Sequence, residues 1–423
     1  MLAHSPPLPL TVDYRSEDDI TAKDEEGILL ALEQRHRVRH IRLLLPVLNP
    51  QKLVMAIDEE FPILEYLILE TLLEEGTVVL QEILLEEGTV VLPETLQAPQ
   101  LRHLALAGFT CPIRTRLHPT AAGLVTLILV IHHQSAYFQP NVLLQWISFL
   151  PHLKSLEVAF SFPVSNRDVE RQPTHTPITT HITLPNLRLF WFRGVSAYLE
   201  ALVCRITTPR LETLQIRLFN QLTFSVPRLL QFMNTTESLR FDDAIIMFKD
   251  KQVTVGMMFR EANTYTFGVT IDSWHLDWQV SSVAQISNAL SQTFPAVEHL
   301  TLQHEIHSQL SEEHNDADRM EWRNILGSFS NLKDLRVEDG LVEELSRCLR
   351  LEDGEAPLEL LPELQELTYF GSRDTGNAFT PFIDARQNAG HPVTLFRHNP
   401  SLSSFEPLTI TSSSDEAGND IQT

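Results

Sequence analysis

A short apolar phrase recurs along the chain. Its core is L-x-x-L-x-Φ, where Φ is apolar, and an apolar residue and usually a proline stand just before it. Eight copies occupy residues 61–69, 98–106, 150–158, 184–192, 208–216, 294–302, 329–337 and 361–369. The last two apolar positions are two residues apart, which is the periodicity of a β-strand with one buried face. Each copy therefore predicts a short strand.

Segments with a helical pattern usually precede these phrases. In residues 141–150, Val142, Trp146 and Leu150 share one helical face. The proline that follows cannot continue the helix and disfavours the α conformation in the residue before it. Strands of about four to six residues thus alternate with helices of about ten, in units of roughly 24 to 35 residues.

This alternation predicts parallel strands joined by right-handed crossovers. Units that repeat in this way bury their apolar faces mainly against their neighbours. The predicted fold class is therefore α/β, a leucine-rich-repeat-like solenoid with irregular repeats. Its parallel strands should lie on the concave side in strict sequential order, with short helices on the convex side.

We expect three regions along the chain. Residues 1–20 are an N-terminal lead-in, residues 21–397 a single degenerate solenoid, and residues 398–423 a disordered tail. A loop insert at 70–97 contains LLEEGTVVL twice, starting at Leu72 and Leu84. This spacing is too short for a strand–helix unit, so the duplication predicts an extra loop or small hairpin. A second insert, at 161–181, is polar and rich in proline and threonine.

The net charge of -23 disfavours nucleic acids and anionic membranes as partners, because proteins that bind them present stripes of lysine and arginine. No apolar run is long enough to span a bilayer, and the start lacks the features of a secretory signal. The cysteines Cys111, Cys204 and Cys348 are far apart, which suits a reducing compartment without disulfides. We expect an intracellular protein of the cytoplasm or nucleus.

The sequence predicts no catalytic residue, no cofactor and no metal. It contains no phosphate-binding glycine loop and no nucleophile elbow. His304-Glu305-Ile306-His307 has the wrong spacing for a helical zinc pair, and 315–318 lacks the glycine and glutamate of a calcium loop. Cys204 fits a buried thiol better than a nucleophile. His132-His133 follows a strand but has no carboxylate at a spacing that argues for a site.

The open side of the predicted sheet is the candidate binding surface. If Leu64, Leu67 and Leu69 face the core, Tyr66 and Ile68 face the other side, and the same offsets apply to each copy. The predicted protein-binding residues are Tyr66, Ile68, His103, Glu157, Leu189, Trp191, Arg193, Gln215, His299 and Arg336. Among them, Trp191 between Leu189 and Arg193 has the composition of a binding hot spot. The alternative is that a flanking loop covers Trp191 and makes it part of the core.

Several phrases resemble the region that follows the F-box in basidiomycete fungal F-box proteins. They are HSPPLPLTVDY, EEGILLALEQRHRVRHIRLLLP, MAIDEEFPILEYLIL, APQLRHLALAGF and FTPFIDARQNAGHPVTL, and the resemblance runs from about residue 4 to residue 395. It implies a substrate receptor of SCF-type ubiquitin ligases, in which the repeats hold a target protein. The chain starts already at the repeat region, so the SCF adaptor is an expected partner only if an F-box lies upstream.

One departure from the regular leucine-rich repeat concerns its asparagine position. The corresponding residues here are Leu72, Phe109, Ser161, Val195, Phe219, Glu305, Gly340 and Ser372. No asparagine ladder can form, so the spacing of the units should be irregular and maintained mainly by apolar packing.

The favoured function is the non-catalytic binding of an unknown target protein. A first alternative is an α/β enzyme with an unrecognised site at the strand ends, which would need a reversal of strand order and a crevice. A second is a truncated or degenerate family member that no longer recruits a ligase.

Overall fold

The computed structural model describes most of the chain. The described residues are 8–15, 20–46, 51–72, 90–110, 115–164, 181–219, 226–236, 238–239, 241–259, 264–273, 275–291, 294–305, 316–350, 359–370 and 376–398. Most of the duplication (73–89), most of the polar loop (165–180), Cys111, His307 and the tail (399–423) lie outside them. Leu72 ends a strand, and Leu92, in the second copy of the duplication, is buried.

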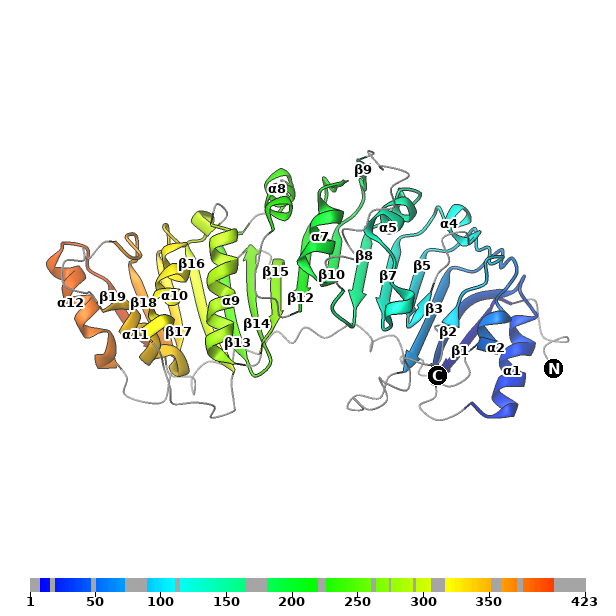
Figure 1. The fold of residues 1–423 in the computed structure, drawn as a ribbon, viewed down its shortest axis with the longest axis horizontal. Helices are drawn as coiled ribbons and strands as arrows, with labels where there is room; N and C mark the ends of the chain where they lie inside the picture. The colour runs from blue at the N-terminus through cyan, green and yellow to red at the C-terminus, as the bar shows by residue number, and fades with distance from the viewer. Residues whose placement is uncertain are drawn as a thin grey trace, which may run out of the picture.

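The fold is α/β, and its centre is one mostly parallel sheet of fifteen strands (Figure 1). In spatial order the strands are β1 (Leu10–Arg15), β2 (Val38–Pro46), β3 (Tyr66–Leu72), β5 (His103–Ala107), β7 (Thr126–Ile131), β8 (Ser155–Phe160), β10 (Leu189–Gly194), β12 (Thr213–Leu218), β15 (Thr264–Asp272), β14 (Gln252–Phe259), β13 (Asp243–Lys249), β16 (His299–Glu305), β17 (Asp334–Glu338), β18 (Glu366–Phe370) and β19 (Thr394–His398). Two small parallel pairs accompany it: β4 (Val90–Val91) with β6 (Phe109–Thr110), and β9 (Ile182–Thr183) with β11 (Ile206–Thr207).

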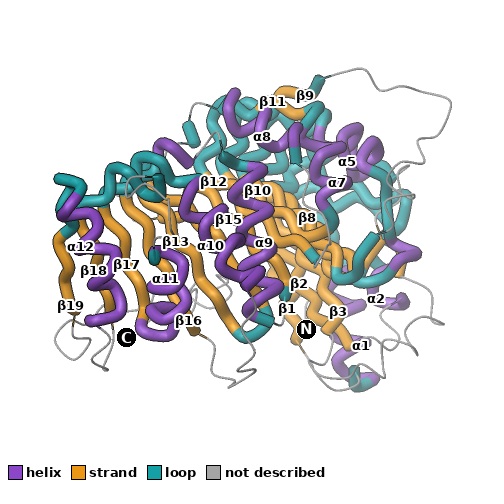
Figure 2. The backbone as a smooth tube through the Cα atoms, turned by 60° about the vertical axis from the view of Figure 1, so that its left-hand side comes forward, coloured by secondary structure: helices purple, strands orange, loops and turns teal. Residues whose placement is uncertain are grey.

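Short helices alternate with these strands. They are α1 (Ala22–Leu32), α2 (Gln51–Met55), α4 (Leu117–Thr120), α5 (Pro140–Ile147), α7 (Ser196–Val203), α8 (Pro227–Thr235), α9 (Leu276–Ala289), α10 (Asp316–Gly327), α11 (Val342–Leu349) and α12 (Thr380–Asn388). Single 3-10 turns are η2 (Gln134–Ala136), η3 (Phe294–Ala296), η4 (Asp339–Leu341) and η5 (Gly376–Phe379). The whole array is elongated and arched, and helices such as α9 to α11 lie in front of the strands (Figures 1 and 2).

The repeated phrases form neighbouring strands of this sheet, as the sequence predicts. Leu67 on β3 is the register partner of Leu104 on β5. Leu156, Leu214 and Leu300 lie farther along the same sheet, and all five leucines are at most 1% exposed within one continuous core. Because each strand buries every second side chain against the helices, the phrases make one long apolar layer.

Local signals in the sequence place several helix ends. Thr21 is the N-cap of α1, and its Oγ1 accepts a hydrogen bond from the backbone N–H of Asp24 at 3.2 Å. Pro140 and Pro227 stand in the first turns of α5 and α8, where the missing N–H costs nothing. Ser281 and Ser282 lie inside α9, and the hydroxyl of Ser282 donates to the carbonyl of Trp278.

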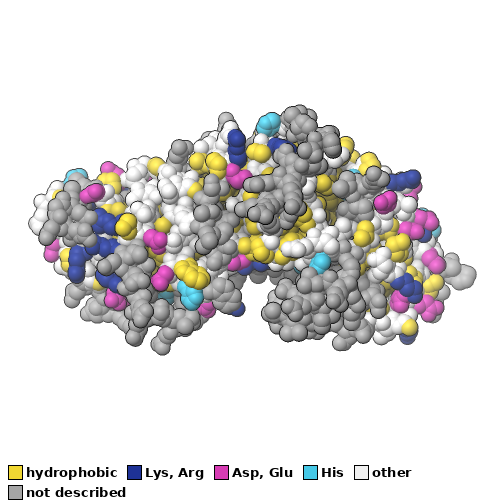
Figure 3. Space-filling view, viewed as in Figure 1, with side chains coloured by type: hydrophobic (Ala, Val, Ile, Leu, Met, Phe, Trp, Pro, Cys, Tyr) yellow, Lys and Arg dark blue, Asp and Glu magenta, His cyan; other side chains and the backbone are white. Residues whose placement is uncertain are grey.

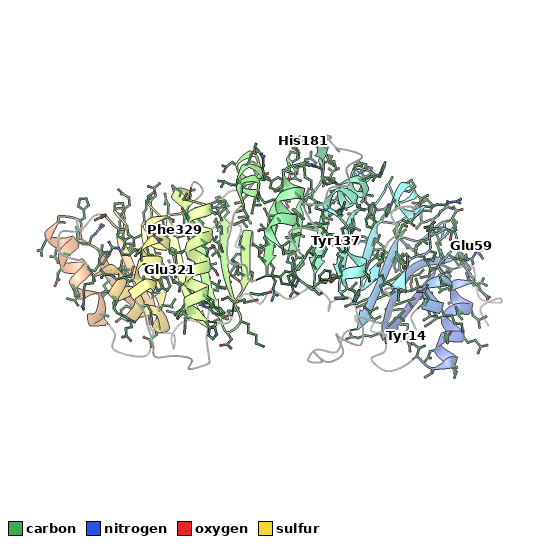
Figure 4. All side chains as sticks on the ribbon, in the orientation of Figure 1. Tyr14, Glu59, Tyr137, His181, Glu321 and Phe329 are labelled. Atoms are coloured by element: carbon green, nitrogen blue, oxygen red, sulfur yellow. The ribbon has the colours of Figure 1, made fainter. Side chains whose placement is uncertain are left out.

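Aromatic residues fill the space between the helices and the middle of the sheet. Tyr137 (labelled in Figure 4) lies beside Phe160 and Tyr198, with ring centroids 5.9 and 6.1 Å away. The hydroxyl of Tyr198 donates to the carbonyl of Phe138, and burial raises its pKa well above its ordinary value. The outer surface on the helix side is mixed, with acidic, basic and apolar side chains interspersed (Figure 3).

The strand order departs from strict sequence between β12 and β16, so the expectation of sequential order is wrong there. The chain passes from β12 to β13, returns through β14 and β15, and the three strands are inserted in reverse order. β14 is antiparallel to both of its neighbours, whereas β15 is parallel to β12 and β13 is parallel to β16. Residues 243–272 lack the repeated phrase and contain alternating runs, which are typical of hairpins.

Candidate functional site

The described helices lie on one side of the sheet, and we name the opposite face the open face (Figures 1 and 2). Along β7 the side chains of Leu127, Leu129 and Ile131 are buried, whereas Thr126 and Ile128 between them are only partly buried. The open face carries this second set of alternating side chains from each strand, and its members vary in chemistry.

Strand register aligns the predicted binding residues in rows across the open face. The first row runs Tyr66, His103, Thr126, Ser155, Leu189 and Thr213. The second runs Ile68, Ala105, Ile128, Glu157, Trp191 and Gln215. Arg193 is in the third row, beside Arg217. Eight of the ten predicted residues therefore lie on the strands from β3 to β12.

His299 and Arg336 form a second group beyond the inserted strands, on β16 and β17. The Nε and Nη2 atoms of Arg336 contact the carboxylate of Asp334 at 2.9 and 2.8 Å, and His299 Nδ1 is 3.6 Å from the same oxygen. Asp334 is buried, and Arg336 supplies the charge-assisted hydrogen bonds to its carboxylate. The structure does not bring His299 and Arg336 together with Trp191.

Aromatic rings pack against one another at the end of the first row. The rings of Tyr66 and His103 are stacked with centroids 4.3 Å apart, whereas His40 contacts Tyr66 edge-on with centroids 4.5 Å apart. His103 Nδ1 also lies 3.1 Å from Thr126 Oγ1. Burial, followed by the nearby positive charge of Arg102, lowers the pKa of His103. The neutral ring favoured in this way suits stacking.

Trp191 lies half-buried on the open face and is not part of the buried core. Its register partners are Glu157 on β8 and Gln215 on β12. Leu189, two residues earlier on the same face, is 39% exposed. Glu157 is half-buried, and this burial raises the pKa of its carboxyl group.

A charged cluster lies next to Trp191, toward the carboxyl ends of the strands. Asp272 at the end of β15 accepts from Nε and Nη2 of Arg217 at 3.0 and 2.8 Å, and Arg193 Nη2 lies 3.9 Å from its second oxygen. The guanidinium of Arg193 also stands over the ring of Phe219, 5.6 Å from the centroid. Burial and, to a lesser extent, the charge of Arg217 lower the pKa of Arg193.

A histidine and a serine meet at the same edge, and the sequence did not single out this pair. His132 Nδ1 lies 2.9 Å from the hydroxyl of Ser161, each residue just beyond the end of a strand. Burial, followed by the charge of Arg193, lowers the pKa of His132 to about 4. Such a histidine is neutral near pH 7 and a weak base, because Arg193 opposes the imidazolium that general-base catalysis would form. The residues are 29 apart, and only the parallel pairing of β7 with β8 brings them together.

The other candidate sites of the sequence have structural partners. Glu305 pairs with Lys249 at 2.9 Å, so the described half of the 304–307 motif is a polar strand end. Within the described ranges no group of three or more histidine, cysteine, aspartate or glutamate side chains is placed to hold a metal ion. Cys204 is half-buried and Cys348 buried, and both are free thiols. No helix in the described part of the chain is long and apolar enough to cross a bilayer.

Neither a scan against protein-family models nor a search of the curated proteins found a match for this chain.

Proposed function

We propose that the chain is a non-catalytic, protein-binding repeat array: an irregular leucine-rich-repeat-like solenoid that holds a target protein on its open face. One observation carries the proposal. From β1 to β12, strands in sequential order pair in parallel with aligned leucines on the helix side, and the opposite side presents aligned, variable side chains. Stacked units of this kind bury their apolar surface against their neighbours, which leaves a long face available for binding.

The composition of the open face supports binding. Tyrosine, tryptophan and arginine dominate binding hot spots, and Tyr66, Trp191 and Arg193 all lie on this face. The inserted strands β13 to β15 interrupt the array, and they divide the face into a large part before them and a smaller part after them.

The resemblance to fungal F-box proteins supports a more specific role as a substrate receptor of an SCF-type ubiquitin ligase. In that role the open face binds the target inside the cell, and an F-box upstream of this sequence binds the adaptor. Without an F-box the chain would still bind its target but would not recruit the ligase.

An α/β enzyme is the second candidate, and two observations favour it. The strand order reverses next to β12, and polar residues gather at the carboxyl ends of β7 to β15, where open parallel sheets place ligands. However, the reversal arises from antiparallel hairpins, and Arg193 weakens His132 as a base. A serine-dependent hydrolysis is therefore poorly supported.

The test is affinity capture from a basidiomycete lysate with three versions of the chain: unmodified, Tyr66→Ala/Trp191→Ala, and Arg347→Gln as a control. Arg347 lies on α11, on the helix side, and the side chain is 46% exposed. We expect the unmodified chain and Arg347→Gln to capture the same target proteins, and the double variant to lose them. Equal capture by all three would contradict binding through the open face. Recovery of the SCF adaptor with a longer chain that includes upstream sequence would test the ligase role separately.

A further inference from the structure

The charged cluster beside Trp191 has more positive than negative charge. Two guanidinium groups, those of Arg193 and Arg217, share the single carboxylate of Asp272. Arg217 makes both of the short contacts, whereas Arg193 reaches the carboxylate only at 3.9 Å. The side chains of Arg193 and Arg217 are 31% and 37% exposed, so a ligand can reach both guanidinium groups. This cluster therefore has unused capacity to bind an anion, although the chain as a whole is strongly acidic.

Apolar surface lies directly beside this cluster. Trp191 precedes Arg193 by two residues on the same face of β10, so their side chains are separated by about 7 Å along the strand. Leu189 extends the apolar surface by one more row, and Phe219 lies beneath the guanidinium of Arg193. An extended segment could place one side chain over Trp191 and a neighbouring one over Arg193.

Glu157 makes the two ends of this surface electrostatically different. It is the register partner of Trp191, and no arginine or lysine pairs with it among the described residues. A carboxylate over Trp191 would be repelled by Glu157, whereas one over Arg193 and Arg217 would be attracted. The acidic group of a bound segment should therefore point toward the carboxyl ends of the strands.

We infer that the open face recognises a partner protein segment in which an aspartate or glutamate stands next to an apolar side chain. The carboxylate binds Arg193 and Arg217, and the apolar side chain packs on Trp191 and Leu189. This inference rests on the proposed function, because it identifies the chemistry of the target. One carboxylate matches the single surplus positive charge that Arg193 and Arg217 retain beside Asp272, whereas a phosphate dianion would leave excess negative charge there.

The test uses a random dodecapeptide display library selected on the full chain, followed by anisotropy titration of an enriched peptide. We expect enriched peptides to contain aspartate or glutamate within two positions of an aromatic or aliphatic residue. Three changes should each weaken binding by about tenfold or more, because charge-assisted hydrogen bonds are lost: Arg193→Gln, Arg217→Gln, and an amide peptide in which asparagine or glutamine replaces the acidic residue. Glu157→Gln should tighten binding, and Arg347→Gln should leave it unchanged.

Measuring the amide peptide on the Arg193→Gln variant distinguishes a direct contact from a general effect of charge. If the peptide carboxylate contacts Arg193, replacing it by an amide should cost less affinity on Arg193→Gln than on the unmodified chain, because only the contact with Arg217 remains to be lost. The thermal midpoint of each variant shows that it is folded, and Arg217→Gln replaces Arg193→Gln should the latter unfold.

Three outcomes would overturn the inference. In the first, enriched peptides lose affinity for Trp191→Ala and yet contain no excess of aspartate or glutamate. That result would agree with the proposed function but would contradict the inference that the partner segment supplies a carboxylate. Tighter binding of a phosphoserine version than of the aspartate version would also refute it. Failure to enrich any peptide that Trp191→Ala or Arg193→Gln weakens would contradict both the inference and the proposed function.

Discussion

The ring of Tyr66 stacks on the imidazole of His103, with planes inclined by only 6°. The two residues are register partners on the adjacent parallel strands β3 and β5. Neighbouring strands are about 4.8 Å apart, which is close to the separation of two stacked rings. A variable position of the repeated phrase therefore becomes a stacked pair of rings when two units pack side by side.

This stack should make a measurable contribution to stability. In a double-mutant cycle with Tyr66→Ala and His103→Ala, we expect a coupling free energy of about 0.5 to 1.5 kcal/mol, measured by urea unfolding. Tyr66→Ala combined with Gln215→Ala is the control. These two residues lie on β3 and β12, several strands apart, so their effects should add. A coupling free energy near zero for Tyr66 and His103 would show that the two rings do not stabilise each other.

The stack also shows what the sequence could predict. The alternation of Leu67 with Tyr66 and Ile68 fixes which side chains share a face, because successive residues of a strand point to opposite sides. Aligned copies of one phrase then bring Tyr66 to His103. β7, which contains none of the eight copies, supplies Thr126 in the same row, and Thr126 is not among the predicted binding residues.

Other parts of the site depend on pairings that no local pattern encodes. Asp272 meets Arg217 only because β15, not β13, pairs with β12. His132 and Ser161 stand just after their strands, where the chain leaves the regular register. The repeated phrase gives no signal for the hairpin of β13 and β14, and neither this hairpin nor its insertion into the middle of the sheet was predicted.

The two faces of the sheet should respond differently to truncation. Leu156 is fully buried against the helices, so Leu156→Ala should reduce the free energy of unfolding by about 2 to 5 kcal/mol. Trp191→Ala, on the open face, should cost about 1 kcal/mol or less while weakening target binding. Chemical unfolding of both variants measures the difference. A loss for Trp191→Ala as large as that for Leu156→Ala would mean that Trp191 is a core residue.

His132 should make stability depend on pH. Its folded pKa of about 4 lies below the unfolded value of about 6.5, so the unfolded chain binds the extra proton first. The contribution of His132 to the free energy of unfolding is therefore present above pH 6.5 and is lost as the pH falls toward 4. Between pH 7 and pH 5 the unmodified chain should lose about 2 kcal/mol more stability than His132→Gln.

Urea unfolding at the two pH values measures this loss, and Arg193→Gln provides a second check. Removal of the arginine takes away a positive charge that lowers the pKa of His132, so the loss of stability on acidification should shrink. Equal pH dependence of the unmodified chain and His132→Gln would exclude this role for His132.

Two glycines should respond in opposite directions to the same substitution. Gly108 has a φ of +80°, and an added Cβ would lie 2.0 Å from Thr71 Oγ1 and 3.0 Å from His132 Cδ2. Gly108→Ala should therefore reduce the free energy of unfolding by about 2 kcal/mol or more, since both the backbone conformation and the space disfavour a side chain. Gly27 lies inside α1, and nothing stands within 4 Å of its added Cβ. Gly27→Ala should increase the free energy of unfolding by about 0.5 to 1 kcal/mol.

Urea unfolding of the two variants tests the pair, and a change of the same sign in both would contradict the positions assigned to these glycines. Because an added Cβ at Gly108 would also displace the ring of His132, Gly108→Ala should disturb the pH dependence of stability, whereas Gly27→Ala should leave that dependence as it is.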